Sequence, residues 1–269
     1  MRDEGVAAAC AGLVKIYWAA TGEVHALKGI DAIFPRGAVT AVIGPSGSGK
    51  SSLLGILACM DRPTAGSVMV GDTEVADLPL RRLHAIRRRL IGYVFQRPSD
   101  NLVPTVSVRD HVELAARRRN RVVATDELLE SLGMGHRRSH MPHQLSGGEQ
   151  QRVAFAQAIA GSPAVVLADE PTAELDSKSA RSLIDAIKGL ASGGSGFVVA
   201  THDPAVIEAA DSTLHLRHGA LEAEQIRGLA LSVIDSSGRI QLPPEALTFF
   251  PERRALLRIE NGELRITPP

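Results

Sequence analysis

The stretch GPSGSGKS, residues 44–51, combines residue types that bind phosphate, and it lies between an apolar run and an expected helix. Glycines let the backbone curl so that its N–H groups face an anion. Lys50 adds a mobile positive charge, and the Ser51 hydroxyl is a ligand suited to Mg²⁺. The pattern predicts a loop that holds the β- and γ-phosphates of a nucleotide. Its residues are Gly44, Pro45, Ser46, Gly47, Ser48, Gly49, Lys50, Ser51 and Ser52.

Two adjacent acids, Asp169 and Glu170, end the apolar run in AVVLADEP, residues 164–171. A buried strand would deliver both side chains to the carboxyl edge of a sheet, where ligands bind in open α/β folds. We expect Asp169 to hold Mg²⁺, directly or through water, and Glu170 to polarise a water aimed at the γ-phosphate. The alternative for paired acids at a strand end is a solvated loop.

His202 and Gln96 also come directly after apolar runs, in VVATHD and IGYVFQ. The same placement makes His202 a candidate for contact with the γ-phosphate and the attacking water. Gln96 offers a neutral carbonyl to the metal or the water. The alternative for His202 is a surface histidine or a hydrogen-bonded core histidine.

A second serine–glycine turn precedes an expected helix in LSGGEQQRVAFAQAI, residues 145–159. Free backbone N–H groups at a helix start bind anions. The turn consists of Ser146, Gly147, Gly148 and Glu149, about a hundred residues beyond the first loop. A plain N-cap serine explains Ser146 equally well, and the capping geometry is what exposes the donors.

Strand and helix patterns alternate along most of the chain, which indicates an α/β fold with a mostly parallel sheet. Helical patterns over residues 97–160 interrupt this alternation as an inserted block. After about residue 228 only short strands and tight turns are expected. We therefore predict a domain at residues 1–228 and a small β-rich C-terminal domain at residues 229–269.

Composition limits the class of protein. The chain has 269 residues, of which 44% are hydrophobic and only 3% aromatic. Its formal net charge is zero, so it lacks the excess of basic residues that is typical of nucleic-acid-binding proteins. Cys10 and Cys59 show no disulfide or metal-ligand spacing and are interpreted as small buried side chains. No apolar stretch reaches the length of a membrane span and no export signal is evident. A cytoplasmic location is expected, with any membrane role through a partner.

Taken together, the phosphate loop, Gln96, LSGGEQQR, LADEP, ELD and His202 occur in an order and spacing that resemble the ATP-binding-cassette (ABC) transporter ATPases. The resemblance covers about residues 10–222. Segments such as IGYVFQRPSDNLVPTVSVRDHV and LADEPTAELDS are similar, more narrowly, to the lipoprotein-release and macrolide-efflux exporter ATPases. The implied fold is a P-loop, RecA-like core with an antiparallel β subdomain and a helical subdomain.

The resemblance implies ATP and Mg²⁺ as cofactors and two cassettes paired head to tail. Each ATP would lie between the phosphate loop of one copy and the Ser146–Glu149 turn of the other. The implied catalytic residues are Glu170, His202 and Lys50, and the implied Mg²⁺ residues are Ser51, Gln96 and Asp169. Asp176 falls on the loop that couples the two sites. Tyr17 matches the aromatic residue that stacks on adenine, although Trp18 is adjacent and strand packing is the alternative.

The partner implied is a separate transmembrane permease, which would hold the ATPase at the inner face of the cell membrane. The sequence departs from the family at Gln157, where arginine is usual, and at Arg97 and Pro98, in the segment that faces the membrane partner. Runs of arginine at 81–89, 117–121 and 137–138 are interpreted as solvated helix faces, with contact to anionic lipid or the permease as the weaker alternative.

Two rival functions remain. One is a soluble non-transport ABC ATPase, disfavoured because the chain has a single phosphate loop and no heptad run. The other is a nucleotide switch that signals through a membrane partner. Neither the substrate nor the direction of transport is encoded in the cassette.

The tail, residues 229–269, resembles AbrB-type swapped-hairpin domains at Asp235, Gly238, Arg239, Ile240 and Pro243. Asn261-Gly262 predicts a hairpin that pairs Ile259 with Leu264 and Leu257 with Ile266. The same register sets Glu260 opposite Glu263 and Arg258 opposite Arg265, which is unfavourable unless the charges pair diagonally. We expect dimerisation or regulation first, a cap on its own cassette second, and DNA binding third.

Overall fold

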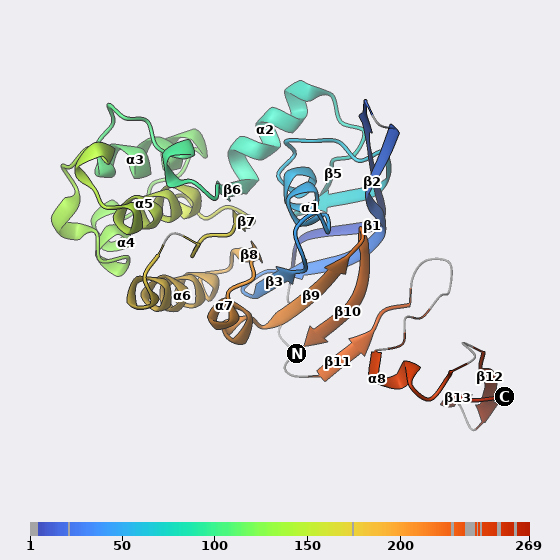
Figure 1. Cartoon of the computed structure of the whole chain (residues 1–269). Helices are drawn as coiled ribbons and strands as arrows, with labels where there is room; N and C mark the ends of the chain where they lie inside the picture. Colours follow the sequence, from blue (N-terminus) through green and yellow to red (C-terminus); the bar gives the residue numbers. More distant parts are fainter. Residues whose placement is uncertain are drawn as a thin grey trace.

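The computed structural model describes residues 5–20, 22–173, 175–226, 229–234, 240, 242, 244–251, 254–260 and 263–269. A seven-stranded sheet in the order β11-β10-β9-β3-β8-β7-β6 forms its centre (Figure 1). The strands are β3 (Val39–Ile43), β6 (Ile91–Val94), β7 (Val165–Asp169), β8 (Gly196–Ala200), β9 (Ser212–Arg217), β10 (Ala220–Ile226) and β11 (Leu229–Ser232).

The five strands β9, β3, β8, β7 and β6 pair in parallel, whereas β10 and β11 add antiparallel. The middle strands are short apolar runs: VVLAD in β7 and GFVVA in β8 are buried over nearly their whole length. Strands covered on both faces read as continuous apolar runs, as parallel strands do. Their carboxyl ends therefore meet at one edge of the sheet.

A second, antiparallel sheet has the order β2-β1-β4-β5. Its strands are β1 (Val6–Ala19), β2 (Gly22–Pro35), β4 (Ala65–Val70) and β5 (Thr73–Glu74). Apolar side chains from this sheet, from the central strands and from α1 (Lys50–Leu57) form one buried cluster, so α1 is packed between the two sheets. Cys10 and Cys59 are buried in it as free thiols, and burial raises the pKa of Cys10 to about 12.

The other helices of the core are α2 (Leu80–Leu90), α6 (Ser177–Ala191) and α7 (Pro204–Ala209). Residues of α5, α6 and α7 form a second cluster with the central strands, on the face away from α1. The predicted α/β fold, with its antiparallel subdomain and helical insertion, is confirmed. Among the described residues, none of the helices has both the length and the apolar character to cross a membrane.

The helical block contains α3 (Val108–Arg118), α4 (Thr125–Ser131) and α5 (Gly147–Ile159) around their own apolar cluster. Three short 3-10 helices join them: Pro98–Asp100, Gly135–Arg137 and Pro142–Gln144.

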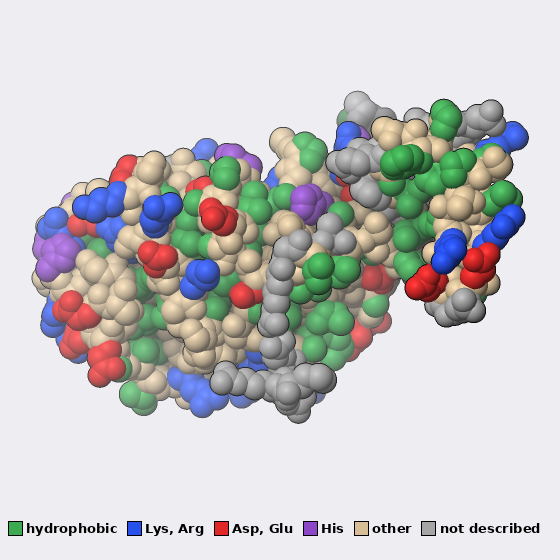
Figure 2. Space-filling view, turned by 90° about the horizontal axis from the view of Figure 1, so that it is seen from below, with side chains coloured by type: hydrophobic (Ala, Val, Ile, Leu, Met, Phe, Trp, Pro, Cys, Tyr) green, Lys and Arg blue, Asp and Glu red, His purple; other side chains and the backbone are tan. Residues whose placement is uncertain are grey.

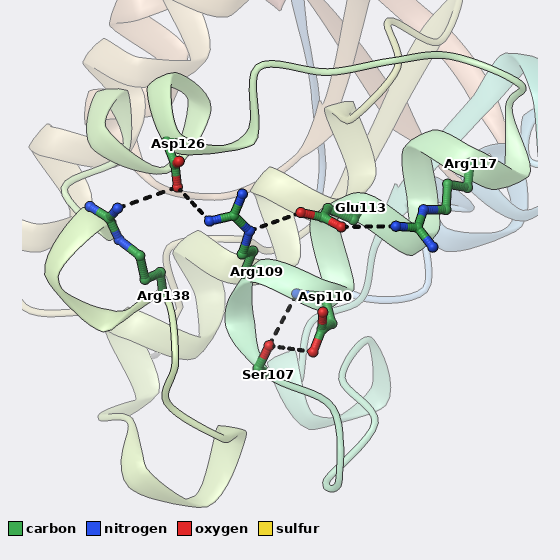
Figure 3. Close-up of polar contacts among 7 residues, drawn as sticks. All are labelled: Ser107, Arg109, Asp110, Glu113, Arg117, Asp126 and Arg138. Atoms are coloured by element: carbon green, nitrogen blue, oxygen red, sulfur yellow. Dashed lines mark hydrogen bonds and ion pairs between the residues drawn. The ribbon is translucent and has the colours of Figure 1, made fainter.

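Ion pairs cover the surface of this block (Figure 3). Arg109 bridges Glu113 (2.8 Å) and Asp126 (3.4 Å), and Arg117 and Arg138 extend the network at either end. Carboxylates thus accompany part of the arginine runs, as expected of solvated helix faces.

The C-terminal segment begins as an extension of the cassette, because β11 pairs with β10 of the central sheet. The boundary predicted at residue 228 falls between these two paired strands, and the division into domains remains a prediction. Beyond β11 lie α8 (Pro244–Leu247) and the hairpin β12 (Leu256–Glu260) and β13 (Glu263–Thr267).

The hairpin has the predicted register. Arg265 forms a diagonal ion pair with Glu260 (3.3 Å), which relieves the opposition of like charges. The predicted turn at Asn261-Gly262, and Asp235, Gly238, Arg239 and Pro243 of the second motif, lie outside the described residues. Ile240 bridges Ile234 in an antiparallel sense.

Candidate functional site

The phosphate loop joins β3 to α1, as predicted, and its backbone needs glycine at defined points. Gly44, Gly47 and Gly49 have positive φ angles of 151°, 76° and 108°. A Cβ atom at Gly44 would collide with the carbonyl of Leu216, and one at Gly49 would lie 2.5 Å from the carbonyl of Ala26. The loop therefore adopts its curl against neighbouring backbone, which leaves the first N–H groups of α1 without partners inside the helix.

Lys50 and Ser51 open α1 and point to different parts of the site. The Lys50 ammonium donates to the carbonyls of Gly44 (2.7 Å) and Pro45 (3.2 Å), so its charge lies over the loop. The Ser51 hydroxyl donates to Asp169 Oδ2 at 2.8 Å. Burial is the main cause that raises the pKa of Asp169, and Lys50 opposes it.

A hydroxyl and a carboxylate side by side are hard oxygen ligands of the kind Mg²⁺ prefers, so these residues fit the predicted metal. A bound cation would also favour the charged form of a carboxyl whose pKa burial raises.

Glu170 follows β7 at a strained point of the chain. Its φ is 45°, unusual for a residue with a side chain. Its N–H donates to the carbonyl of Ala200 (2.9 Å), which ties the turn to the end of β8. The carboxylate is 16% exposed and lies 2.9 Å from Nδ1 of His202, a well-exposed ring that follows the same β8. The sheet therefore brings together the two residues predicted to meet the water and the γ-phosphate.

Gln96 lies two residues beyond the end of β6, because the strand stops at Val94. β6 pairs in parallel with β7, and Val94 is level with Ala168, so Gln96 follows at the level of Glu170 on the adjacent strand. Its side chain is exposed. The arrangement places it at the correct edge, and its contact with metal or water remains a prediction.

Tyr17, near the end of β1, stands beside the first turn of α1. Its hydroxyl lies 2.8 Å from Asp61 Oδ2 and 3.3 Å from Ser52 Oγ, and the Lys15 ammonium is 4.7 Å from the ring centre. Burial is the main cause that raises the pKa of Tyr17. The phosphate loop and Tyr17 are thus held together, whereas Trp18 is the more exposed of the two aromatic residues. Asp61 had no recognisable sequence signal, since it is 44 positions away.

The Ser146–Glu149 turn caps α5 as a capping box. The Glu149 N–H donates to Ser146 Oγ (3.3 Å), and the Ser146 N–H donates to Glu149 Oε2 (2.8 Å). Arg137 Nε holds the other Glu149 oxygen at 2.9 Å. The Ser146 backbone bond, with the Ser146 hydroxyl and Arg137, lowers the pKa of Glu149 to about 2. Arg137, interpreted from sequence only as part of a solvated run, supports this turn.

Gly147 differs from the glycines of the phosphate loop. A Cβ atom at Gly147 would meet no atom of the chain within 4 Å. One at Gly148 would lie 3.3 Å from Leu175 Cδ2, next to the start of α6. Ser146 and Gly147 are exposed to solvent. This surface therefore has space for a group from outside the chain.

Asp176 is the N-cap of α6 and accepts from the N–H groups of Lys178 and Ser179, each at 3.0 Å. The Ser179 hydroxyl is the main cause that lowers the pKa of Asp176. Its predicted role in coupling two sites remains a prediction. Gln157 stands where arginine is usual in the family. Its side-chain Oε1 is buried and has no hydrogen-bond partner among the described residues. Its backbone carbonyl accepts from Arg119 Nη1 at 3.5 Å.

The two anion-binding helix starts belong to two different helices, α1 and α5. Figure 1 shows α5 in the helical block on the left, whereas α1 lies beside the antiparallel sheet on the right.

Comparisons with known proteins show which family the chain resembles. The family model for ABC transporters matches residues 27–173. The chain is 40% identical over 228 residues to the lipoprotein-releasing system ATP-binding protein LolD of Bordetella pertussis, covering 82% of this chain and 98% of LolD. It is 41% identical over 209 residues to the macrolide export ATP-binding/permease protein MacB 1 of Aeromonas hydrophila, covering 76% of this chain and 32% of that longer protein.

Among solved structures, the ATP-binding cassette MJ0796, in a dimeric post-hydrolysis state with ADP and phosphate, superposes with a TM-score of 0.75 at 35% identity. It covers 82% of this chain and 100% of MJ0796. The match of motifs, fold and sequence leads to one conclusion: the chain belongs to the ABC transporter family, as an ATP-binding subunit of the ATP-hydrolysing cassette type.

Proposed function

We propose that two copies of this ATPase pair head to tail around ATP and thereby drive a separate transmembrane permease. The observation that carries the proposal is the open, exposed surface over Gly147 at the start of α5, a helix other than the one that follows the phosphate loop. A turn with exposed N–H donors and space for a ligand fits the γ-phosphate of a nucleotide held by another copy. The dimeric structure of MJ0796 bound to ADP and phosphate supports the pairing of two copies.

The residues at the carboxyl edge of the sheet would divide the chemistry. Glu170 would orient a water and accept its proton. His202, which is paired with the Glu170 carboxylate, would fix the orientation of that carboxylate. Lys50 would shift from the loop carbonyls to the phosphates. Ser51, Asp169 and Gln96 would hold Mg²⁺, which when bound supplies positive charge to the phosphate oxygens. ATP hydrolysis would then remove the γ-phosphate contacts that hold two copies together.

Glu170→Gln tests the assignment of the base. The variant should lose ATP turnover by at least about 100-fold, because the general base is gone, and should retain ATP through gel filtration in Mg²⁺. Chelation of Mg²⁺ should release that nucleotide. The matched control Glu127→Gln, at an exposed carboxylate of α4, should keep normal turnover. Turnover that survives Glu170→Gln would remove Glu170 from the mechanism.

A cytoplasmic position on the inner face of the membrane follows from this proposal, because the permease would be the only membrane-spanning part of the assembly. Purification of the chain with a co-expressed permease, from detergent-solubilised membranes, tests it. Recovery of the ATPase without the permease, in the presence of nucleotide, would count against transport and would favour the soluble alternative.

A further inference from the structure

Helix α2 presents a group of arginines to solvent and contains no acidic residue. Its sequence, LRRLHAIRRRL, has five arginines, and four of them are exposed: Arg81, Arg82, Arg88 and Arg89. None of these four side chains forms an ion pair with any residue that the structure describes. Their charges are therefore compensated only by solvent and its ions.

The opposite face of α2 is packed on the core. Leu83 is 4% exposed, and Ile86 and Leu90 pack against the same apolar cluster as α1. At about 100° per residue these three side chains share one face of the helix. Arg81 and Arg88, two turns apart, lie on the other face. The part of α2 that remains available to a partner is therefore charged and not apolar.

Two hydrogen bonds fix α2 to the segment that follows α1. Arg87, the fifth arginine of α2, donates from Nη1 to the carbonyl of Cys59 at 3.5 Å. Arg62 donates from Nη2 to the carbonyl of Leu78, just before α2, at 2.7 Å. These two arginines have structural partners, and they hold the helix that carries the four exposed ones.

The arginines at the start of α2 do not stabilise the helix itself. Arg81 and Arg82 lie in the first turn, where the helix dipole disfavours positive charge, and the N-cap Pro79 supplies no side-chain cap. Helix α3 has the favourable arrangement, with Ser107 as its cap and Asp110 in its first turn. Helix stability therefore does not explain these two arginines, whereas an anionic partner would.

Charges elsewhere on the chain are more evenly mixed. On α3, Arg109 and Arg117 both pair with Glu113. Figure 1 shows α2 at the top of the molecule. Figure 2 shows the molecule from below, the side away from α2, and there basic and acidic side chains are interspersed. Because the formal net charge of the chain is zero, the charge of α2 is a local excess.

The residue types on the exposed face indicate the chemistry of the partner. Guanidinium groups bind phosphate oxygens with two parallel hydrogen bonds. The helix has no aromatic residue to stack on a base and no Asn or Gln to read base edges. A protein interface needs an apolar centre, and the one large apolar side chain exposed on α2 is Leu80, at its first position. A phosphate-bearing lipid surface needs only the positive charges.

We propose that the four exposed arginines of α2 bind the phosphate headgroups of an anionic membrane. The contact is electrostatic, because the apolar face of α2 is packed on the core and does not insert among acyl chains. Each arginine near such a surface strengthens binding about fivefold. The contact needs neither nucleotide nor a permease, so it goes beyond the proposed function and is tested apart from it.

The test measures co-sedimentation of the full chain, without nucleotide, with vesicles of phosphatidylglycerol and phosphatidylcholine in equal parts. The wild-type protein should bind these vesicles at low salt and should not bind phosphatidylcholine alone. Binding should be lost at about 1 M salt, where the Debye length is about 3 Å. The double variant Arg81→Gln/Arg88→Gln should bind about 25-fold more weakly, because two charges are lost. Glutamine has a helix propensity close to that of arginine.

Two further variants separate the position of the charges from their number. The matched control Arg118→Gln/Arg121→Gln removes the same charge from exposed positions of the helical block and should bind like the wild type. The variant Arg81→Lys/Arg88→Lys keeps the charge and should retain most of the binding. ATP retention in the Glu170→Gln background checks that the α2 variants are folded.

Three results would overturn the proposal: no binding of the wild type to the anionic vesicles, equal weakening by the α2 and control pairs, or tighter binding to DNA than to the vesicles. Loss of ATP retention in Glu170→Gln alone contradicts the proposed function and leaves this contact standing.

Discussion

The glycines of the site differ in what a side chain would meet in their place. Gly44 and Gly49 have positive φ angles and lie against the backbone of Leu216 and Ala26, so the fold of one copy requires them. Gly147 lies in an open position at the first turn of α5. Glycine is a poor helix former and packing does not require it here, but under the proposed function it allows the close approach of a ligand.

Gly147→Ala should therefore impair the enzyme without harming its fold. The free energy of unfolding should stay the same or rise by up to about 1 kcal/mol, because alanine favours the helix. The methyl group would push a phosphate away from the Ser146 turn, and ATPase activity should fall about 10- to 100-fold. Gly189→Ala, at another open helical glycine, is the matched control and should leave activity unchanged. Full activity in Gly147→Ala would mean that no ligand approaches this surface.

At the scale of elements, one buried arginine joins the helical block to the sheet. Arg119, at the end of α3, donates to the carbonyls of Ala160 (2.6 Å), Ile91 (2.8 Å) and Ala158 (3.0 Å). Arg119 thus supplies hydrogen-bond donors to carbonyl groups at the end of α5 and links this helix to the start of β6. Ser146 caps the other end of α5, and Gln96 follows β6. Burial lowers the pKa of Arg119 to about 10, so it stays charged at neutral pH.

Arg119→Met should lower the free energy of unfolding by about 2–4 kcal/mol, because it leaves buried carbonyls without their donor. Urea titration followed by circular dichroism would measure this. The adjacent, exposed Arg118→Met should change stability by less than about 0.5 kcal/mol. Equal effects of the two substitutions would show that the three carbonyl contacts do not hold the block in place.

His111, on α3, gives the helical block a dependence on pH. It is buried, its Nδ1 lies 2.8 Å from the carbonyl of Ser107, and its Nε2 accepts from the N–H of Val103 at 2.8 Å. An imidazole that accepts at Nε2 is neutral, and burial is the main cause that lowers its pKa below 6.5. In acid the unfolded chain takes up this proton before the folded chain does.

The contribution of His111 to the free energy of unfolding should therefore be complete above about pH 6.5. It should fall as the pH drops from the pKa of the unfolded chain toward the lower pKa of the folded chain, by about 1.4 kcal/mol for each pH unit between these two pKa values. Urea unfolding at several pH values between 8 and 5 measures the slope. His111→Gln should reduce that slope, whereas the exposed His84→Gln should not. An unchanged slope in His111→Gln would assign the acid sensitivity to other groups.

Sequence patterns predicted the short apolar strands well, because β7 and β8 are buried on both faces and end in polar residues that the sheet edge brings together. The length of β1 was not predictable from GLVKIY. The strand extends over 14 residues through Ala7, Ala8 and Cys10, and register shifts interrupt the alternation that normally marks a strand. Small residues of this kind carry little pattern by themselves.

Long-range partners of the site residues also escaped prediction. The pairs Tyr17 with Asp61 and Glu149 with Arg137 depend on tertiary packing, which has no local signal. The capping box was readable, since Ser146 and Glu149 have the spacing of that motif. The extension of the central sheet by β11 could not be predicted from the sequence, because the pairing of β11 with β10 depends on tertiary packing.

At the scale of the whole molecule, the phosphate loop and the Ser146 turn belong to different parts of the fold. The loop is fixed between the two sheets, and the turn is carried by the helical block. Under the proposed function, each of them is one half of a nucleotide site, and a second copy supplies the other half. Each of these features is explained by an enzyme that works as a pair.

The most direct test of the shared site mixes two inactive chains, both in the Glu170→Gln background. One carries Lys50→Met and cannot hold ATP at its own loop, and the other carries Ser146→Arg and cannot cover the loop of a partner. Each alone should fail to retain ATP through gel filtration in Mg²⁺, whereas the mixture should retain it, because one intact loop then meets one intact turn. A mixture that retains no ATP, while Glu170→Gln itself does, would contradict the shared site.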